Sequence, residues 1–240
     1  MSLLSIKNVS KSFGSLRVTD DLTFELKEGE AIGILGPNGA GKTTLFNLIS
    51  GDLKPDSGDI VLNDESILHL SSSQRCIEGF GRTYQVPHPF EGMSVFENVL
   101  VGAVFGNNHT QKEAEELALL ILEQTGLIDK AEVLAGSLSL LERKRLELAK
   151  ALSTQPKILL LDEIAGGLTE HEVKELIELI QEIRKAGVSI IWIEHIVHAL
   201  LSVVDKIVAI NFGRMLIQGE PQMVMNSPEV KEVYMGIEIE

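Results

Sequence analysis

Apolar and polar positions alternate at the start of the chain and give way to short, fully apolar runs further on. Residues 3–6 and 17–26 alternate, and residues 11–15 between them have the composition of a turn, so we expect an antiparallel hairpin. Residues 31–35 are wholly apolar, which is typical of a strand buried on both faces of a sheet. Residues 45–49 then have the composition of a buried helix. The pattern therefore predicts a strand, a loop and a helix in succession.

Later segments repeat the alternation of buried strands and helices. Residues 158–161 are a further apolar run, residues 188–193 form a second one that Ser189 interrupts, and residues 170–186 between them form an amphipathic pattern of helical period. Residues 206–210 and 215–217 flank a turn that contains glycine, which predicts a second hairpin. Strands that alternate with helices in this way indicate an α/β fold.

The middle of the chain lacks a strand pattern. Residues 90–155 show helical periodicity, clearest over 111–125 and 141–153. We therefore expect a helical subdomain inserted into a core made of residues 1–89 and 156–240, all within a single domain that spans the chain.

The segment 79–100 just ahead of and entering this insert is irregular in pattern. It contains two prolines and several aromatic residues of the kind found on surfaces. Such a connection is as consistent with a docking surface as with a plain loop.

Composition limits the partners and the compartment. The chain has 240 residues, enough for a sizeable core, and a formal net charge of −14, which disfavours nucleic acid because phosphate contacts need clustered Lys and Arg. The single cysteine, Cys76, fits a reducing compartment. No apolar run approaches the ~20 residues that cross a bilayer, and the start lacks a cleavable signal. We expect a cytoplasmic protein.

Residues 36–44 read GPNGAGKTT and satisfy the phosphate-binding pattern GxxxxGK(S/T) in the required context of strand, loop and helix. Exposed backbone N–H groups and the positive end of the helix dipole favour an anion there. Lys42 can reach the β- and γ-phosphates, Thr43 can bind a magnesium ion, and Thr44 can bond near the α-phosphate. The alternative is a glycine-rich turn before an ordinary helix. The candidate nucleotide-binding residues here are Gly36, Pro37, Asn38, Gly39, Ala40, Gly41, Lys42, Thr43 and Thr44.

Titratable residues follow two of the later apolar runs. Asp162 and Glu163 follow the apolar run 158–161, and here Asp162 would hold magnesium through water and Glu163 would orient or deprotonate an attacking water. Strands often end in acidic residues, but their joint occurrence with the phosphate loop favours the functional reading. His195 follows the run 188–193, and we expect it at the same sheet edge facing the phosphates, although a lone histidine is more often structural.

With Gln85 added, the order and spacing of these residues resemble the nucleotide-binding subunit of an ABC transporter over nearly the whole chain. Within that family the chain looks most like the ATP-binding subunits of branched-chain amino acid importers. The segments that carry this closer likeness are 82–85, 156–168, 193–195 and 227–236.

The resemblance implies a P-loop NTPase fold with a RecA-like core, a small antiparallel β subdomain and the inserted helical subdomain. It implies ATP and Mg²⁺ as ligands. Phe13 would stack on adenine, although packing within the small sheet is the alternative. Gln85 would sense the magnesium and the γ-phosphate, Glu163 would be the catalytic carboxylate, and His195 would act as a switch on the γ-phosphate.

The resemblance also implies partners. Two such subunits sandwich two ATP molecules, so a homodimer or a pair of paralogous subunits is expected. The segment after Gln85 would receive a helix from a transmembrane permease subunit. The chain would then lie peripherally on the cytoplasmic face of the cell membrane, and the solute would touch only other chains.

The sequence departs from the family pattern at residues 138–142, which read LSLLE where LSGGQ is usual. Ser139 and Glu142 would still lie at the ATP of the opposite subunit. Two leucines replace glycines, and a left-handed conformation there would cost roughly 1–2 kcal/mol, so we expect a loop that is weakened or differently shaped. Glu142 adds negative charge if it is ionised. Ile164 replaces a usual proline, and Thr169 replaces a usual Asp or Asn.

The leading hypothesis is an ATPase that energises solute import, with branched-chain amino acids as the solute. The alternatives are the ATPase of an exporter, such as the lipopolysaccharide export machine, and a regulatory module that binds ATP without hydrolysing it. A soluble P-loop switch or kinase is a further class, but the sequence lacks the Asn-Lys-x-Asp motif with which a GTPase reads guanine.

Overall fold

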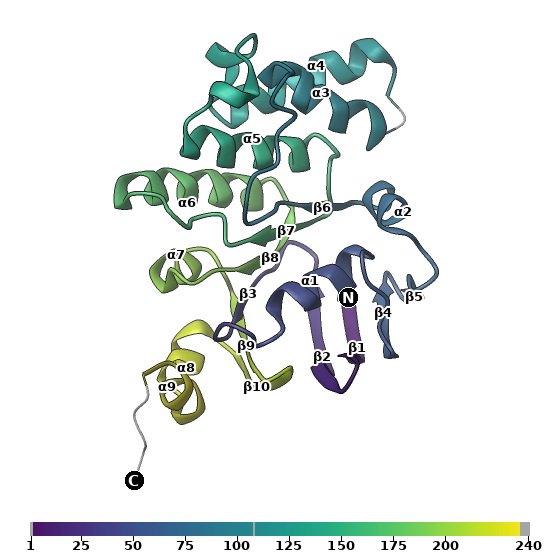
Figure 1. Cartoon of the computed structure of the whole chain (residues 1–240), viewed down its shortest axis with the longest axis vertical. Coiled ribbons are helices and arrows are strands. Elements are labelled where there is room, and N and C mark those ends of the chain that lie inside the picture. Colours follow the sequence, from purple (N-terminus) through teal and green to yellow (C-terminus); the bar gives the residue numbers. More distant parts are fainter. Residues whose placement is uncertain (1, 108, 236–240) are drawn as a thin grey trace. The chain divides into compact units, whose positions relative to one another are not determined.

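The computed structural model describes residues 2–107 and 109–235 and has an α/β fold (Figure 1). The chain forms two compact units. The first unit comprises Met1–Arg75 and Ser189–Glu240, and the second comprises Cys76–Val188. The second unit thus holds two strands and a further helix besides the helical stretch expected at 90–155.

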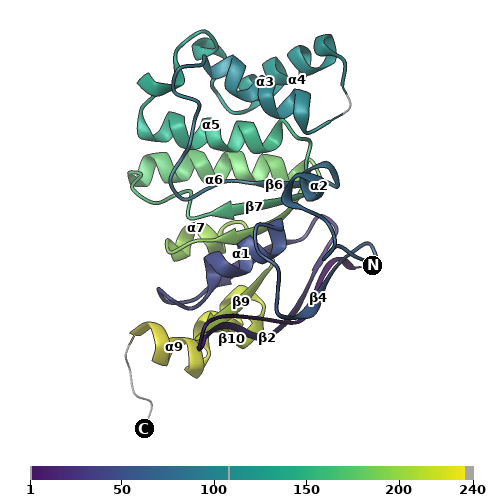
Figure 2. The ribbon, with the colours of Figure 1, turned by 45° about the vertical axis from the view of Figure 1, so that its right-hand side comes forward.

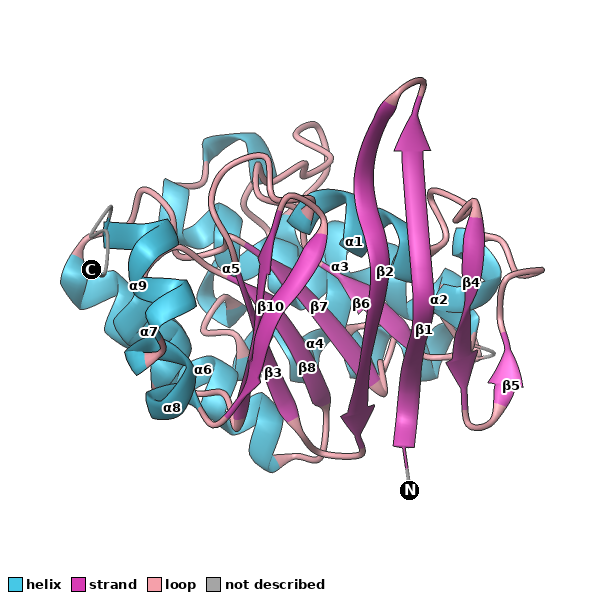
Figure 3. Ribbon diagram, turned by 90° about the horizontal axis from the view of Figure 1, so that it is seen from below, coloured by secondary structure: helices cyan, strands magenta, loops and turns pink. Residues whose placement is uncertain are grey.

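An antiparallel sheet in the first unit contains the predicted N-terminal hairpin (Figure 3). The hairpin is confirmed, but its strands run further than expected, and the turn is confined to Gly14 and Ser15 because Phe13 pairs directly with Leu16. The strand order is β2-β1-β4-β5. The strands are β1 (Ser2–Phe13), β2 (Leu16–Lys27), β4 (Ser57–Leu62) and β5 (Glu65–Ser66).

A second group of strands in the first unit positions the phosphate loop. Strand β3 (Ala31–Leu35) lies between β8 (Ser189–Ile193) and β9 (Lys206–Asn211) and pairs with both in parallel, while β10 (Arg214–Gly219) forms the predicted hairpin with β9. All residues of β3 and β8 are buried, as continuous apolar runs predict. The helices of this unit are α1 (Lys42–Ser50), α7 (Val197–Leu201), α8 (Pro221–Asn226) and α9 (Pro228–Met235). Gly236, the last residue of the family-like ending, lies outside the described residues.

The second unit pairs two parallel strands with helices (Figure 2). Strand β6 (Phe80–Arg82) pairs with β7 (Ile158–Asp162). Strand β6 was not expected within the irregular segment 79–100, whereas the helix that begins at Val95 agrees with the helical periodicity expected over 90–155. The helices are α3 (Val95–Phe105), α4 (Gln111–Gln124), α5 (Leu140–Leu152) and α6 (Glu170–Lys185), with 3₁₀ turns η1 (Ile128–Lys130) and η2 (Ala135–Ser137) and with α2 (Ser72–Ile77) at the boundary of the units.

Four helices of the second unit begin with the same device. In each, a Ser or Thr accepts a hydrogen bond from the backbone N–H three residues later, and a Glu at that later position accepts from the backbone of the capping residue. A cap of this kind is worth about 1 kcal/mol. The pairs are Ser94 and Glu97, Thr110 and Glu113, Ser139 and Glu142, and Thr169 and Glu172.

The far end of α1 is held by a buried arginine. The Arg75 side chain donates to Leu48 O and Ile49 O, each at 2.8 Å, and to Ile67 O at 2.9 Å. Burial lowers the pKa of the Arg75 guanidinium, and the charge of Asp52 opposes that shift. The guanidinium thus satisfies carbonyls that the helix end leaves without intrahelical donors.

Arg75→Met is expected to lower the free energy of unfolding by about 3 kcal/mol, because three buried carbonyls lose a charged donor. Urea denaturation measures the change. Lys112→Met, at an exposed position of α4, is the control and should change stability by less than about 0.5 kcal/mol. Equal stability of the two variants would show that Arg75 does not hold α1.

No helix within residues 2–107 and 109–235 combines the length and apolar character that a bilayer crossing demands.

Candidate functional site

The phosphate loop connects β3 to α1 through two close backbone approaches. A Cβ atom on Gly36 would lie 2.6 Å from Ile210 O, and one on Gly41 would lie 2.4 Å from Val18 O. Gly41 also has φ 98° and is the N-cap of α1. Both positions therefore require glycine, because any side chain would displace a neighbouring strand.

A chain of backbone hydrogen bonds fixes this loop within the first unit. Ala40 N donates to Pro37 O at 3.1 Å, and Gly213 N donates to Ala40 O at 3.0 Å. Asp20 N in turn donates to Gly213 O at 2.8 Å. The loop is therefore tied to the turn between β9 and β10 and, through it, to β2.

Lys42 is buried, and its ammonium group donates hydrogen bonds to backbone carbonyls of the phosphate loop itself. Its Nζ donates to Gly36 O at 2.7 Å and to Pro37 O at 3.1 Å, and the residue is only 6% exposed. Asn38 and Thr43 are exposed and Thr44 is half-buried. Since the first turn of a helix presents N–H groups without intrahelical acceptors, the outer face of this loop suits an anion.

His195 follows β8, the parallel neighbour of β3, and its side chain is exposed. The residue before it, Glu194, is 2% exposed, and its Oε1 accepts from the backbone N–H groups of His195 (2.9 Å) and Ile196 (3.3 Å). The carboxylate thus fixes the backbone from which His195 projects. His195 and the phosphate loop follow the carboxyl ends of adjacent parallel strands.

In the second unit, Asp162 is the last residue of β7 and is 4% exposed. Its Oδ2 lies 3.5 Å from Nη2 of Arg82, and its backbone N–H donates to Thr83 Oγ1 at 3.2 Å. Arg82 is the last residue of β6 and Thr83 follows it directly, so the pairing of β6 with β7 positions this carboxylate.

Glu163 meets Gln85 although 78 residues separate them: Gln85 Nε2 donates to Glu163 Oε2 at 2.7 Å. Glu163 has φ 47°, which costs on the order of 1–3 kcal/mol for a residue other than glycine. Lys144, which is 4% exposed, donates to Gln85 O at 3.1 Å and to Glu163 O at 3.2 Å. Lys144 thus holds both backbones, and no feature of the sequence pattern pointed to it.

The loop at 138–142 is not strained. Ser139 has φ −63° and ψ 169° and caps α5, and the two leucines after it belong to the first helical turn. All of residues 138–142 are described, and none has a positive φ. The expected left-handed strain was wrong, because the chain passes directly from an extended cap into a helix. Of the two alternatives, the loop is differently shaped.

The charge of Glu142 is compensated. Its carboxylate pairs with Lys130, and its other oxygen accepts from Ser139 N at 2.8 Å. The pairing with Lys130 and the capping bonds hold the pKa of Glu142 below its usual value, so the group is ionised but has a cation beside it. Lys130 lies in η1 and was not found from the sequence.

Phe13 and Thr169 occupy exposed positions. Phe13 ends β1 and is 48% exposed, with Lys11 Nζ 5.8 Å from its ring centroid, so it is not part of the sheet's core. Thr169 caps α6 through Glu172. The departure at Thr169 is therefore a helix cap.

Comparison with known families matches residues 19–166 to the model described as ABC transporter. The chain belongs to the ABC transporter family. Like the ATP-binding proteins of this family, the chain binds nucleotide and is an ATPase.

Relatives with ATP-binding roles match this chain over nearly its whole length. It is 37% identical over 249 residues to the high-affinity branched-chain amino acid transport ATP-binding protein LivG of Escherichia coli (strain K12), covering 98% of each protein. It is 33% identical over 236 residues to the lipopolysaccharide export system ATP-binding protein LptB of Haemophilus influenzae, again covering 98% of each.

Solved structures confirm the predicted P-loop NTPase fold of an ABC ATPase. A nucleotide-free ATP-binding cassette from an ABC transporter matches with a TM-score of 0.89 at 28% identity, covering 99% of this chain and 100% of that one. The ADP conformation of a further ABC transporter cassette matches with a TM-score of 0.88 at 29% identity, covering 99% and 100%.

Gly41→Ala is expected to weaken ATP binding by about a hundredfold or more, because the clash with Val18 O adds to the strain of a positive φ. Gly39→Ala is the matched control: its φ is 81°, but a Cβ there meets nothing within 4 Å, so we expect a loss below about tenfold. Isothermal titration of each chain with ATP gives the affinities. Equal losses would contradict the role of the close approach at Gly41.

Lys130→Met is expected to lower stability by less than about 1 kcal/mol at pH 7, because the ion pair is partly exposed. The pKa of Glu142 lies below the reference value of 4.5 in the folded chain, so this stabilisation is present above pH 4.5 and is lost as the pH falls through the folded value. Urea denaturation of both chains from pH 7 down to pH 3 should show the difference vanish. A difference that stays constant with pH would refute the pairing.

Proposed function

We propose that this chain hydrolyses ATP on the phosphate loop, with Glu163 as the general base, and thereby energises the import of branched-chain amino acids. The ATPase activity of the ABC transporter family, to which the chain belongs, supports the hydrolysis of ATP. The contact that carries the assignment of the base is the 2.7 Å hydrogen bond from Gln85 to the Glu163 carboxylate, on a backbone that Lys144 holds.

The residues from Gly36 to Thr44 bind the triphosphate in this proposal. The amides of the loop and of the first turn of α1 donate to the phosphate oxygens. Lys42, whose ammonium group already lies on Gly36 O and Pro37 O, supplies positive charge at the β- and γ-phosphates. Phe13, half-exposed at the end of β1, offers a ring face to adenine.

The oxygen ligands available suit magnesium that arrives with ATP. Among the described residues, no group of three or more His, Cys, Asp or Glu side chains could hold a metal alone. Magnesium is commonly held by one or two protein oxygens together with substrate phosphates. The Thr43 hydroxyl and the Asp162 carboxylate are such oxygens, and the amide oxygen of Gln85 is a third. When bound, the ion neutralises charge on the phosphates.

In the chemical step, Glu163 accepts a proton from the attacking water as the water oxygen bonds to the γ-phosphorus. The bond between that phosphorus and the β–γ bridging oxygen breaks, and ADP leaves with the electron pair. Gln85 orients the Glu163 carboxylate, and His195 donates to the γ-phosphate oxygens as they separate.

The partners follow from the same proposal. A second ATP-binding subunit, identical or paralogous, completes the site of each ATP, and Ser139 with the helix N-terminus that it caps meets the ATP of the opposite subunit. Transmembrane permease subunits carry the solute and contact the segment after Gln85. The chain then works at the cytoplasmic face of the membrane, without contact to the solute or to nucleic acid.

Import of branched-chain amino acids has the support of the LivG relative at 37% identity. Lipopolysaccharide export is the alternative, and the LptB relative at 33% identity supports it. A module that binds ATP without hydrolysing it had its basis in the altered loop at 138–142; that loop carries no left-handed strain, which weakens this alternative.

Glu163→Gln is expected to lower steady-state ATP hydrolysis by about a hundredfold or more while ATP affinity stays within about threefold, because only the proton acceptor is lost. Glu170→Gln, in the exposed first turn of α6, is the control and should leave hydrolysis unchanged.

Glu163→Gln also tests whether branched-chain amino acids are the transported solute, when the chain is assembled with its membrane subunits in proteoliposomes. ATP-dependent accumulation of labelled leucine should occur with the unaltered chain and stop with Glu163→Gln. Unchanged hydrolysis in Glu163→Gln would reject Glu163 as the base, and hydrolysis without leucine uptake would reject the importer assignment.

A further inference from the structure

Two segments of the second unit run side by side just before α5 begins. Residues 91–96 and 131–136 are joined by backbone hydrogen bonds and by a bridge between Ser94 and Leu134. They form a short antiparallel ladder that ties the segment following Gln85 to the chain leading into α5. The bonds run from Val95 N to Val133 O (2.9 Å), from Ala135 N to Met93 O (3.0 Å) and from Gly136 N to Glu91 O (3.2 Å).

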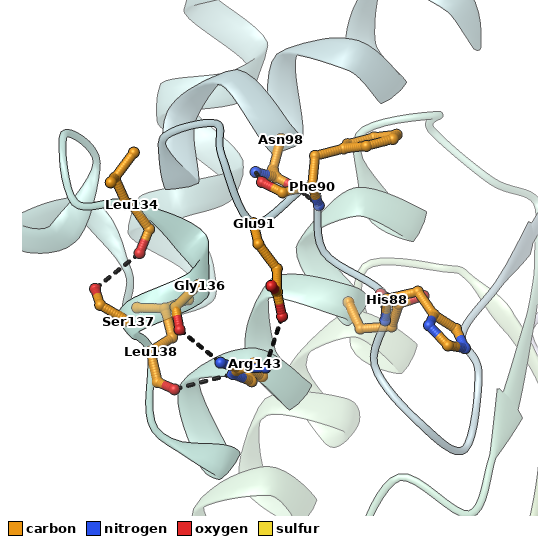
Figure 4. Close-up of polar contacts among 10 residues, drawn as sticks. His88, Phe90, Glu91, Asn98, Leu134, Gly136, Ser137, Leu138 and Arg143 are labelled. Carbon is orange, nitrogen blue, oxygen red and sulfur yellow. Dashed lines mark hydrogen bonds and ion pairs between the residues drawn. The ribbon is translucent and has the colours of Figure 1, made fainter.

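Arg143 spans the end of this ladder and the loop that leads to Ser139 (Figure 4). Its Nη2 donates to Gly136 O at 2.6 Å, its Nε donates to Leu138 O at 3.0 Å, and its Nη1 lies 3.4 Å from Glu91 Oε1. Figure 4 shows the Glu91 carboxylate and the two carbonyls converging on the guanidinium from different directions. One planar group therefore bridges two separate segments.

The segment 86–91, on the Glu91 side of this bridge, has a backbone held at Phe90 and side chains that are exposed. Asn98, fully buried, accepts from Phe90 N at 2.8 Å and donates to Phe90 O at 3.1 Å. Phe90 is nevertheless 49% exposed, and Val86 is 63% exposed. A force applied to these apolar side chains thus acts on a backbone that is held to α3 and, through Glu91, to Arg143.

We propose that Arg143 is a positioning residue that couples the segment 86–91 to the loop 136–139. When a membrane subunit displaces the segment, Glu91 and the ladder carry the displacement to Arg143, and Arg143 carries it to Gly136 and Leu138. The N-cap at Ser139 moves with them. This inference rests on the proposed function, because it takes the segment as the membrane contact and Ser139 as a contact to the second subunit's ATP.

A guanidinium suits this role better than an ammonium group. Three acceptors lie around Arg143 in directions that the fixed fork of Nε, Nη1 and Nη2 matches simultaneously. Loss of the fork leaves the carbonyls of Gly136 and Leu138 without their charged donor. The loop would then keep its capped helix but lose its connection to the docking segment.

Hydrogen exchange of the free full-length chain tests the connection directly. In Arg143→Gln, amides of the peptide 134–142 should exchange about tenfold faster, because their loop loses a charge-assisted bond. Glu91→Gln should raise the same exchange roughly two- to threefold. Arg145→Gln is the matched control, since Arg145 lies on the same helix but pairs with Glu175, and it should leave these amides unchanged.

Coupling is measured in the complex with membrane subunits in proteoliposomes. Arg143→Gln should leave the free chain's ATP affinity within about twofold and lower the ratio of complex to free-chain hydrolysis roughly fivefold. Glu91→Gln should lower that ratio in the same direction, and the double variant should be no worse than Arg143→Gln alone.

Several results would overturn the proposal. The first is hydrogen exchange of the peptide 134–142 that is equal in Arg143→Gln and Arg145→Gln. The second is a loss of hydrolysis in Arg143→Gln that is equal in the free chain and in the complex. The third is a double variant in which the effects of Arg143→Gln and Glu91→Gln multiply. If Arg143→Gln does not fold, Glu91→Gln decides, because its side chain is 67% exposed and an unchanged ratio would refute the coupling. An unaltered chain without hydrolysis would reject the proposed function, and the exchange result would still decide the connection.

Discussion

Basic side chains of helix α5 hold the main chain of three separate segments of the second unit. Lys144 donates to Gln85 O and Glu163 O, Lys150 donates to His88 O at 2.9 Å, and Arg143 donates to the carbonyls ahead of α5. A buried ammonium group is costly unless such acceptors surround it. The position of the Glu163 carboxylate therefore depends on one helix, because Gln85 and Glu163 meet only where Lys144 fixes both backbones.

The phosphate loop depends on a different constraint. Its shape follows from backbone contacts that leave no space for side chains, at Gly36 against Ile210 and at Gly41 against Val18. Here the strands supply a rigid surface, and the backbone of the loop packs directly against it. In the proposed mechanism, nucleotide binding and hydrolysis thus rest on two kinds of preorganisation, one by close backbone packing and one by charged donors on carbonyls.

The sequence predicted the parts of the fold that local pattern controls. The apolar run of β3, the glycine motif after it and helix α1 are contiguous, so each supports the reading of the others. Strand β6 escaped prediction, because three residues carry no period and the strand exists only through its pairing with β7. The positive φ of Glu163 and the burial of Lys144 are likewise tertiary effects that no local pattern marks.

The loop at 138–142 shows a misreading that the sequence could have prevented. Comparison with a glycine-containing family pattern led to expected strain, whereas Ser139 and Glu142 form a capping box whose spacing is visible in the sequence. The same spacing at Thr169 and Glu172 explains the departure at Thr169. The departures at 138–142 and at Thr169, which looked like losses, are helix starts.

A crystal structure of the Glu163→Gln chain with ATP and Mg²⁺ tests the central claim most directly. The account predicts that the phosphates lie on the amides from Gly39 to Thr43, that Thr43 and Asp162 face the metal, and that the residue at 163 faces a water in line with the γ-phosphorus. Phosphates bound away from the loop, or a metal without Asp162 nearby, would contradict it.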